Sequence, residues 1–211
     1  MYFNRLIKAN EFTKEIGLPG VEINPRSKNE YLSLANFHSK IKSHLGITHP
    51  NQLFQCCSIV SVLLKTIIEE TFNCKAYVTI GDINNLDRSI YNINENYIRS
   101  IITPGKNSLN TDNYRHHAWI TLDSMEIIDY THLTTYSYHN KTMSNEQKMK
   151  YLSAIISGTP ETLKLKGMEY VPVMVGDEFY RKYDSTYKTQ ASIYVQDLLQ
   201  NDYTDAPLFA D

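Results

Sequence analysis

The chain has 211 residues, of which 42% are hydrophobic and 21% charged, and these values are typical of a folded globular protein and exclude wholesale disorder or a fibrous repeat. This length suffices for one substantial hydrophobic core, so a single domain spanning 1–211 is expected. The 21 Lys and Arg residues against 23 Asp and Glu give a net charge of -2, which argues against a nucleic acid as the main partner.

The amino-terminal segment MYFNRLIKANEFTKEIG lacks the uninterrupted apolar stretch of a secretory signal peptide. No window of the sequence approaches the ~18 consecutive apolar residues that a membrane-spanning helix needs. We therefore expect a cytoplasmic protein that does not bind a membrane, with export by a non-classical route left open.

The three cysteines, Cys56, Cys57 and Cys74, form an odd set, and the first two are adjacent. A disulfide between neighbouring residues would need a strained ring. Free thiols in a reducing compartment are therefore expected, and a free thiol raises the question of reactivity. Cys74 lies beside the start of a predicted strand without any partner motif, so we expect it to act as a small buried apolar residue.

The first half of the chain predicts helices followed by a strand. Residues 1–50 are expected to form a helical layer, with a turn at 17–20 and a helical pattern over 29–45. The strongest helix signal covers 52–72, where apolar residues occupy almost every side, so this helix is expected to be central and buried. The β-branched and aromatic residues over 74–83 predict a strand.

The second half predicts short elements around a long loop. The polar, Asn-rich segment 84–112 predicts an excursion over the surface. Two short strands at 116–122 and 126–131 are spaced for a hairpin, and a helix over 144–157 and a strand over 169–176 follow.

Taken together, these elements predict an α+β fold in which a central buried helix packs on an antiparallel sheet. The core is expected over about 50–131 and a C-terminal extension over about 140–211. Pro172 favours an edge position for the last strand, because proline cannot donate to a strand ladder. The chain then ends in a frayed tail after a short helical stretch at 192–200.

A candidate nucleophile lies near the start of the 52–72 helix. A thiol becomes nucleophilic near neutral pH when its thiolate is stabilised, as the free N–H groups in the first turn of a helix can do. Pro50 and Asn51 mark a natural entry to this helix, because proline disfavours helix before it and asparagine can cap. Cys56 and Cys57 both stand close to that entry.

Helix geometry favours one of these two cysteines. The face that begins at Cys57 carries Ser61, Leu64 and Ile68. A small residue one turn below the thiol lets the helix press closely on a sheet that carries a catalytic base. The face of Cys56 is bulkier at its first turn, so packing favours Cys57 and leaves Cys56 as the alternative.

The predicted hairpin offers a base and an acid. A catalytic histidine needs a rigid element and a second group that fixes its tautomer. His117 and Asp129 are twelve residues apart, and a hairpin turning near 123–125 brings them nearly opposite each other, where side chains approach to ~5 Å. His116 is expected to point to the other face, so only one of the two histidines can be the base.

These motifs resemble those of the transglutaminase-like superfamily. They are Cys57 with a small residue four places on, the strand-like CKAYVTIGD, His-Ala-Trp at 117–119 and Asp-Tyr-Thr at 129–131. The resemblance implies a papain-like core, a triad of Cys57, His117 and Asp129, and acyl transfer on an amide or peptide bond through a thioester. It implies a protein or peptide substrate and no cofactor. Oligomeric state and the choice among hydrolysis, deamidation and transamidation stay open.

The implied chemistry also needs donors for an oxyanion. The backbone N–H of Cys57 is the obvious first donor, and Gln52 or Gln55 could supply a second. Gln52 is preferred because it lies farther upstream and can reach around the helix start.

Two other functions compete with this hypothesis. A zinc site is conceivable, since Cys56, Cys57, His116, His117 and Asp129 are all competent ligands, but adjacent ligands make poor tetrahedral geometry and no CxxC or HxxxH spacing is present. A binding module that keeps the fold without turnover is the second, with 84–112 as its contact surface.

Three further residues are assigned no catalytic part. Trp119 is expected to pack in the core against the helix. His132 and His139 fall in a predicted loop rich in Thr and Tyr, where no role is expected.

Overall fold

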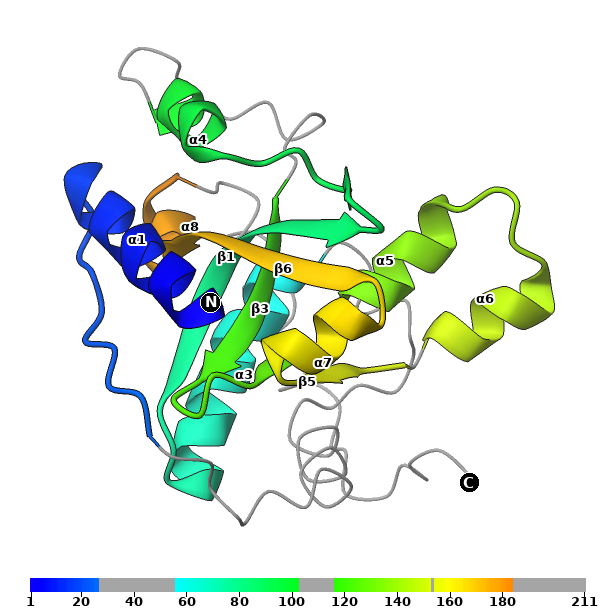
Figure 1. The fold of residues 1–211 in the computed structure, drawn as a ribbon, viewed down its shortest axis with the longest axis horizontal. Coiled ribbons are helices and arrows are strands. Elements are labelled where there is room, and N and C mark those ends of the chain that lie inside the picture. Colours follow the sequence, from blue (N-terminus) through cyan, green and yellow to red (C-terminus); the bar gives the residue numbers. More distant parts are fainter. Residues whose placement is uncertain (27–55, 103–115, 153, 184–211) are drawn as a thin grey trace, which may run out of the picture.

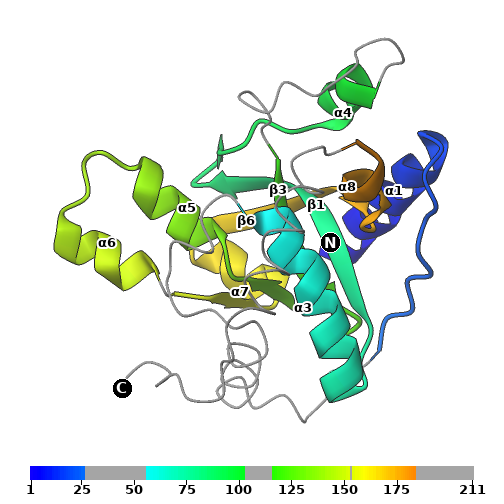
Figure 2. The same ribbon diagram turned by 180° about the vertical axis from the view of Figure 1, so that it is seen from behind.

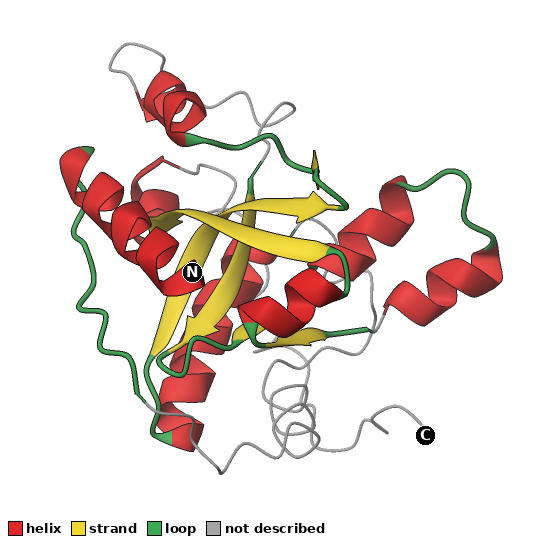
Figure 3. Cartoon of the chain, in the orientation of Figure 1, coloured by secondary structure: helices red, strands yellow, loops and turns green. Residues whose placement is uncertain are grey.

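One curled antiparallel sheet forms the centre of the molecule in a computed structural model that describes residues 1–26, 56–102, 116–152 and 154–183 (Figures 1 and 3). Its strands run in the order β6-β1-β3-β4-β5, and the two-residue β2 pairs with the end of β1. The strands are β1 (Ala76–Asn85), β2 (Arg88–Ser89), β3 (His117–Leu122), β4 (Ile127–Asp129), β5 (Ile156–Gly158) and β6 (Met168–Val175).

The long helix α3 (Cys57–Phe72) covers one face of this sheet (Figure 2). It packs against β1 and β3 through the apolar side chains that its sequence places on most sides. It ends at Asn73, whose φ of 48° is the left-handed conformation common after the last turn of a helix. The predicted arrangement of a buried helix on an antiparallel sheet is therefore present.

The opposite face is covered by α1 (Tyr2–Glu15) and α7 (Pro160–Leu165) (Figure 1). Apolar residues of α1 recur every three or four positions and are buried, as expected for a helix with one face on a sheet. Four shorter helices complete the described chain: α4 (Glu95–Ile102), α5 (His132–His139), α6 (Asn145–Leu152) and α8 (Glu178–Tyr183).

Strand β3 is buried on both faces, and its alternate side chains belong to two different clusters. Ala118 and Ile120 lie in the cluster that includes α3, whereas Trp119 lies in the cluster on the α1 side. The expectation that Trp119 packs against the long helix is therefore wrong. Successive side chains of a strand point to opposite faces, so Trp119 must share the face of His117, and the apolar even-numbered positions meet the helix.

Gly81 allows three segments to approach closely at the centre of the sheet. The register of β1 against β6 shifts between Ile80 and Gly81. A Cβ atom at this position would lie 2.1 Å from the backbone oxygen of Val171 and 2.8 Å from the Trp119 ring. Only glycine fits here, because the Val171 backbone is held in the sheet and the Trp119 ring is buried.

Several element boundaries differ from the sequence prediction. The segment 84–112 is not a plain loop, since its described part contains β2 and α4. The predicted strand 126–131 stops at Asp129, and α5 follows where a loop was expected. The predicted helix 144–157 stops at Leu152 and gives way to β5.

Other predictions lie outside the described residues, namely the helices at 29–45 and 192–200 and the start of the 52–72 helix with Gln52 and Gln55. β6 pairs with β1 alone among the described strands, which is the edge position that Pro172 predicted. Within the described ranges no helix is both long enough and apolar enough to cross a membrane.

Candidate active site

Cys57 is the first residue of α3, and Cys56 is its N-cap. The Cys57 side chain is 8% exposed and its thiol lies 3.9 Å from the backbone oxygen of His116, which accepts a hydrogen bond from it in the protonated form. The helix face that begins at Cys57 is fully buried, with Ser61 and Leu64 at 2% and 1% exposure. A thiol in the first turn of a helix receives the positive end of the helix dipole.

His117 and Asp129 meet across the neighbouring strands β3 and β4. His117 is the first residue of β3 and Asp129 the last of β4, and their Nε2 and Oδ2 atoms are 2.6 Å apart. Both side chains are almost fully buried. Ile120 pairs with Ile128, so continuing this register puts Trp119 opposite Asp129. His117 and Asp129 are thus diagonal neighbours on one face of the sheet. The sequence predicted that they would lie directly opposite each other, but the register is shifted by two residues.

The carboxylate of Asp129 is held by several donors at once. Its Oδ1 accepts hydrogen bonds from the backbone N–H groups of Thr131 and His132, both at 3.0 Å. Its Oδ2 accepts a bond of 2.9 Å from the Tyr170 hydroxyl on β6 in addition to the His117 contact. Burial alone raises the pKa of Asp129, but the charge and hydrogen bond of His117 and these backbone donors hold it well below its usual range.

The two adjacent cysteines differ in their pKa. Burial by itself raises the pKa of Cys57, but the positive charge and hydrogen bonds of His116 and His117 lower it to about 6. Burial and the charge of Cys57 raise the pKa of Cys56 to about 11. At neutral pH Cys57 is therefore mainly thiolate, while Cys56 stays a thiol.

His117 is the positive partner of this thiolate. Burial disfavours its charged form, yet Asp129 and Cys57 raise the pKa of His117 to about 10. Because Nε2 is engaged by Asp129, Nδ1 is the ring nitrogen that remains for the hydrogen bond between His117 and Cys57. The arrangement is a buried thiolate and imidazolium with a carboxylate behind the ring, which suits nucleophilic attack on a carbonyl followed by proton donation.

His116 plays a larger part than the sequence indicated. The strand begins at His117, so the alternation that was expected to turn His116 away does not govern its ring. His116 is the strongest lowering influence on the pKa of Cys57, and its ring lies 5.2 Å from that of Tyr180 in α8. Both histidines therefore act on one thiol, and His117 is also paired with the carboxylate of Asp129.

Two residues without a predicted role lie against the imidazole of His117. The Tyr91 ring stacks on it at a centroid distance of 4.8 Å and an interplanar angle of 5°. The His132 ring meets it edge-on at 5.5 Å, and its Nδ1 shares a 2.9 Å hydrogen bond with the Tyr91 hydroxyl. His132 is 3% exposed and is the first residue of α5. The prediction that it lies in a loop is therefore wrong.

A sequence signal for α5 existed in Asp129 itself. An aspartate that accepts bonds from the N–H groups two and three residues later starts helices and turns. His139, by contrast, is the last residue of α5.

Cys74 and the possible metal ligands are the remaining candidates from the sequence. Cys74 is buried, and burial together with the charges of Asp123 and Glu69 raises its pKa to about 11. Across the described residues, no three His, Cys, Asp or Glu side chains gather in a way that could hold a metal ion.

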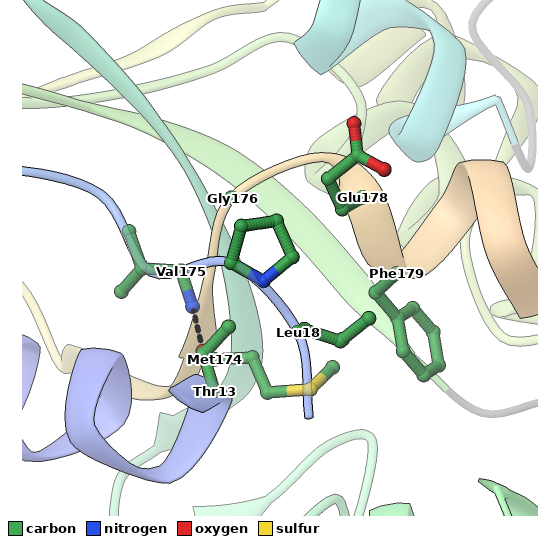
Figure 4. Close-up of a pocket in the computed structure, with 8 residues that line it drawn as sticks. Thr13, Leu18, Met174, Val175, Gly176, Glu178 and Phe179 are labelled. Carbon is green, nitrogen blue, oxygen red and sulfur yellow. Dashed lines mark hydrogen bonds between the residues drawn. The ribbon is translucent and has the colours of Figure 1, made fainter. Parts of the chain in front are cut away.

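A separate pocket lies between the end of α1 and the link from β6 to α8 (Figure 4). Its lining is mainly apolar, and it includes none of the residues around Cys57. Val175 N–H donates a hydrogen bond of 3.0 Å to the Thr13 hydroxyl across it. The space between these side chains is too small for a water-sized ligand, so it is not a substrate site.

Comparisons of the chain with known protein families, curated proteins and solved structures find no relative. A scan against models of protein families finds no match. Searches of curated proteins and of solved structures find no significantly similar protein. The function must therefore be argued from the geometry and chemistry of the residues alone.

Proposed function

We propose that the chain is a cysteine-dependent acyl-transfer enzyme that acts on an amide or peptide bond through a thioester on Cys57. The observation that carries this proposal is the position of Cys57 at the start of a buried helix beside the His117–Asp129 pair, an arrangement that lowers the pKa of the thiol. Activated thiols of this kind occur where a nucleophile is to be formed at neutral pH, whereas cysteines that only fill space have raised pKa values, as Cys56 and Cys74 do.

In the proposed reaction the Cys57 thiolate attacks the carbonyl carbon, and the C–N bond breaks as His117 donates its proton to the leaving amine. Asp129 keeps the ring oriented and stabilises the imidazolium. Water or a second amine then attacks the thioester, giving up a proton to His117, and the thiolate returns. The backbone N–H of Cys57 lies in the first turn of α3, where such groups have no partner within the helix, and it can donate to the oxyanion.

The fold assignment belongs to the same proposal. A cysteine at the first turn of a central helix, with His and Asp on neighbouring antiparallel strands, supports a papain-like core of the transglutaminase-like kind. Tyr130 stands where that family usually has proline. Three free cysteines among the described residues support a reducing location such as the cytoplasm. A protein or peptide substrate and a role for Gln52 as second oxyanion donor remain predictions.

The test is the pH dependence of alkylation at each cysteine, followed by peptide mass spectrometry with iodoacetamide. We expect Cys57 labelling to rise with a midpoint near pH 6, because the thiolate forms as the pH passes its pKa. Cys57→Ala should abolish the alkylation that appears near pH 6. Cys56→Ala, the matched control, should leave that alkylation unchanged. Labelling of Cys57 only above about pH 8, the range of an ordinary thiol, would favour the inactive binding module instead.

Reaction class is tested by intact mass after incubation with peptides and small amines. A thioester intermediate adds the acyl group to the wild-type chain and not to Cys57→Ala. Product masses separate hydrolysis, deamidation and cross-linking. In acyl transfer the rate should fall again as the pH passes about 10, where His117 loses the proton that it donates.

A further inference from the structure

We propose that Tyr91 is a positioning residue for His117, held in place by Asp82 and His132, so that the segment after β1 is part of the catalytic machinery. The inference rests on the proposed function, since it concerns the imidazole of the same site. The observation behind it is the nearly parallel stack of the Tyr91 and His117 rings, 4.8 Å apart at 5°.

The chain around Tyr91 is shaped to deliver this ring. The carboxylate of Asp82 on β1 accepts hydrogen bonds from the Tyr91 N–H at 2.9 Å and from the Ser89 hydroxyl. Asp82 is 6% exposed, and its Oδ1 also accepts from Ile83 N–H at 2.8 Å. One buried carboxylate therefore folds the chain back over β1 and fixes the backbone of Tyr91 above the site.

The far end of the Tyr91 side chain is fixed as well. Its hydroxyl lies 2.9 Å from Nδ1 of His132. Burial, together with the positive charge of His117, lowers the pKa of His132 to about 4 against the opposing effect of Asp129. Burial raises the pKa of Tyr91 well above its ordinary value. Both groups are therefore neutral throughout the physiological range, and the hydrogen bond joins a phenol to a neutral imidazole.

These contacts close a circuit around the catalytic pair. His132 donates its backbone N–H to Oδ1 of Asp129, and Asp129 binds Nε2 of His117 through Oδ2. Tyr91 completes the circuit by stacking on His117 and sharing a hydrogen bond with His132. A residue that only filled space would need neither the parallel stack nor two polar anchors.

The stack has two physical consequences. It blocks rotation of the His117 ring out of its plane, which keeps Nε2 on Asp129 and Nδ1 toward Cys57. It also places the negative face of an aromatic ring over a cation, which stabilises the imidazolium. Three charged groups act on the Tyr91 ring. They are Cys57 in α3, Asp82 in β1 and Asp129 in β4.

The test compares Tyr91→Leu with Tyr91→Phe by imidazole NMR titration of His117, assigned with a His117 variant. Tyr91→Leu should lower the pKa of His117 by about one unit, the equivalent of a partly desolvated cation–π contact. Tyr91→Phe keeps the ring and should lower it by much less. Tyr97→Leu is the matched control, because it removes another half-buried tyrosine ring, in α4, and should leave the titration unchanged.

The His132 anchor is tested in the same titration. His132→Leu should give the same small drop as Tyr91→Phe, and the double variant no further drop, since both remove one hydrogen bond. A Tyr91→Leu titration that is unchanged or shifted upward overturns the inference. If Tyr91→Leu does not fold, additive effects of Tyr91→Phe and His132→Leu overturn it instead.

Failure of this inference can be told apart from failure of the proposed function. If wild-type Cys57 alkylates with the midpoint of an ordinary thiol, the proposed function fails and the inference fails with it. If the wild type is activated near pH 6 and Tyr91→Leu changes neither the His117 titration nor the alkylation of Cys57, only the positioning role of Tyr91 fails.

Discussion

The two faces of β3 are built from different interactions. The even-numbered positions from 118 to 122 are apolar and lie in the cluster that includes α3. The odd-numbered positions from 117 to 121 are His, Trp and Thr, and every one of these side chains makes a hydrogen bond. One face is held by close packing and the other by directed polar contacts.

This difference teaches how a triad of this kind can be assembled. Packing fixes where the first turn of α3 lies, and with it the position of Cys57, but it is not directional. Hydrogen bonds fix the orientation of rings, and His117 needs orientation more than position. Substitutions on the α3 face should therefore change stability, and those on the α1 face should change reactivity as well.

The largest effect is expected from Asp129→Asn. The buried imidazolium of His117 loses its counter-charge, so stability at neutral pH should fall by about 3–5 kcal/mol. Without the imidazolium the pKa of Cys57 rises, while His116 still holds it below that of a free thiol, and alkylation at pH 6 should slow by about 10-fold. Asp123→Asn is the matched control, a buried carboxylate in the same hairpin that should leave Cys57 labelling unchanged. Equal rates for the two variants would contradict a link between Asp129 and the thiolate.

On the opposite face we expect Leu64→Ala to lower stability without changing reactivity. Leu64 is 1% exposed in α3, and loss of such a side chain costs about 2–5 kcal/mol. Leu63→Ala, at a partly buried position on the same helix, should cost less. Both are measured by urea unfolding, with Cys57 alkylation followed in the folded protein. A shift of the alkylation midpoint in Leu64→Ala would show that the two faces are not separable.

The sequence predicted the parts of this site that depend on local pattern. Helix α3 follows from apolar residues on most sides, and the β3–β4 hairpin from two β-rich runs with a short turn. The side chains of Cys57, His117 and Asp129 come together because those elements are neighbours in the sheet and its covering helix. The face of Trp119 could also have been predicted, because it must share parity with His117.

What the sequence did not predict depends on contacts between distant segments. Tyr91 and His117 are separated by much of the polar segment, and their stack requires the Asp82 carboxylate to fold that segment back. Helix α5 is different, because its Thr-rich start has low helix propensity and depends on local bonds to Asp129, a signal that the sequence did contain. Helix propensity and hydrophobic periodicity carry no information about contacts between segments that are distant in the sequence.

A smaller effect is expected from Tyr170→Phe. The Tyr170 hydroxyl donates to a charged acceptor, Oδ2 of Asp129, and such bonds contribute about 1.5–3 kcal/mol. The pKa of Asp129 is depressed in the folded state, so its stabilisation is present above the ordinary aspartate pKa and lost as the pH falls below it. The deficit of Tyr170→Phe should therefore be largest near pH 7 and shrink under acid, as measured by chemical unfolding at a series of pH values.

The smallest effect is expected from Tyr2→Phe, which lies on the same face and is also buried. Its hydroxyl accepts from Trp119 Nε1 at 3.0 Å and shares a 2.7 Å bond with the Thr121 hydroxyl, so all its partners are neutral. Loss of such a group costs about 0.5–1.5 kcal/mol. The deficit should not depend on pH between 3 and 8, since burial raises the pKa of Tyr2 to about 12 and neither partner titrates there. A loss of stability in Tyr2→Phe that depends on pH would mean that the polar face is one coupled network. The protonation state of Asp129 would then affect the hydrogen bonds of Tyr2 in α1.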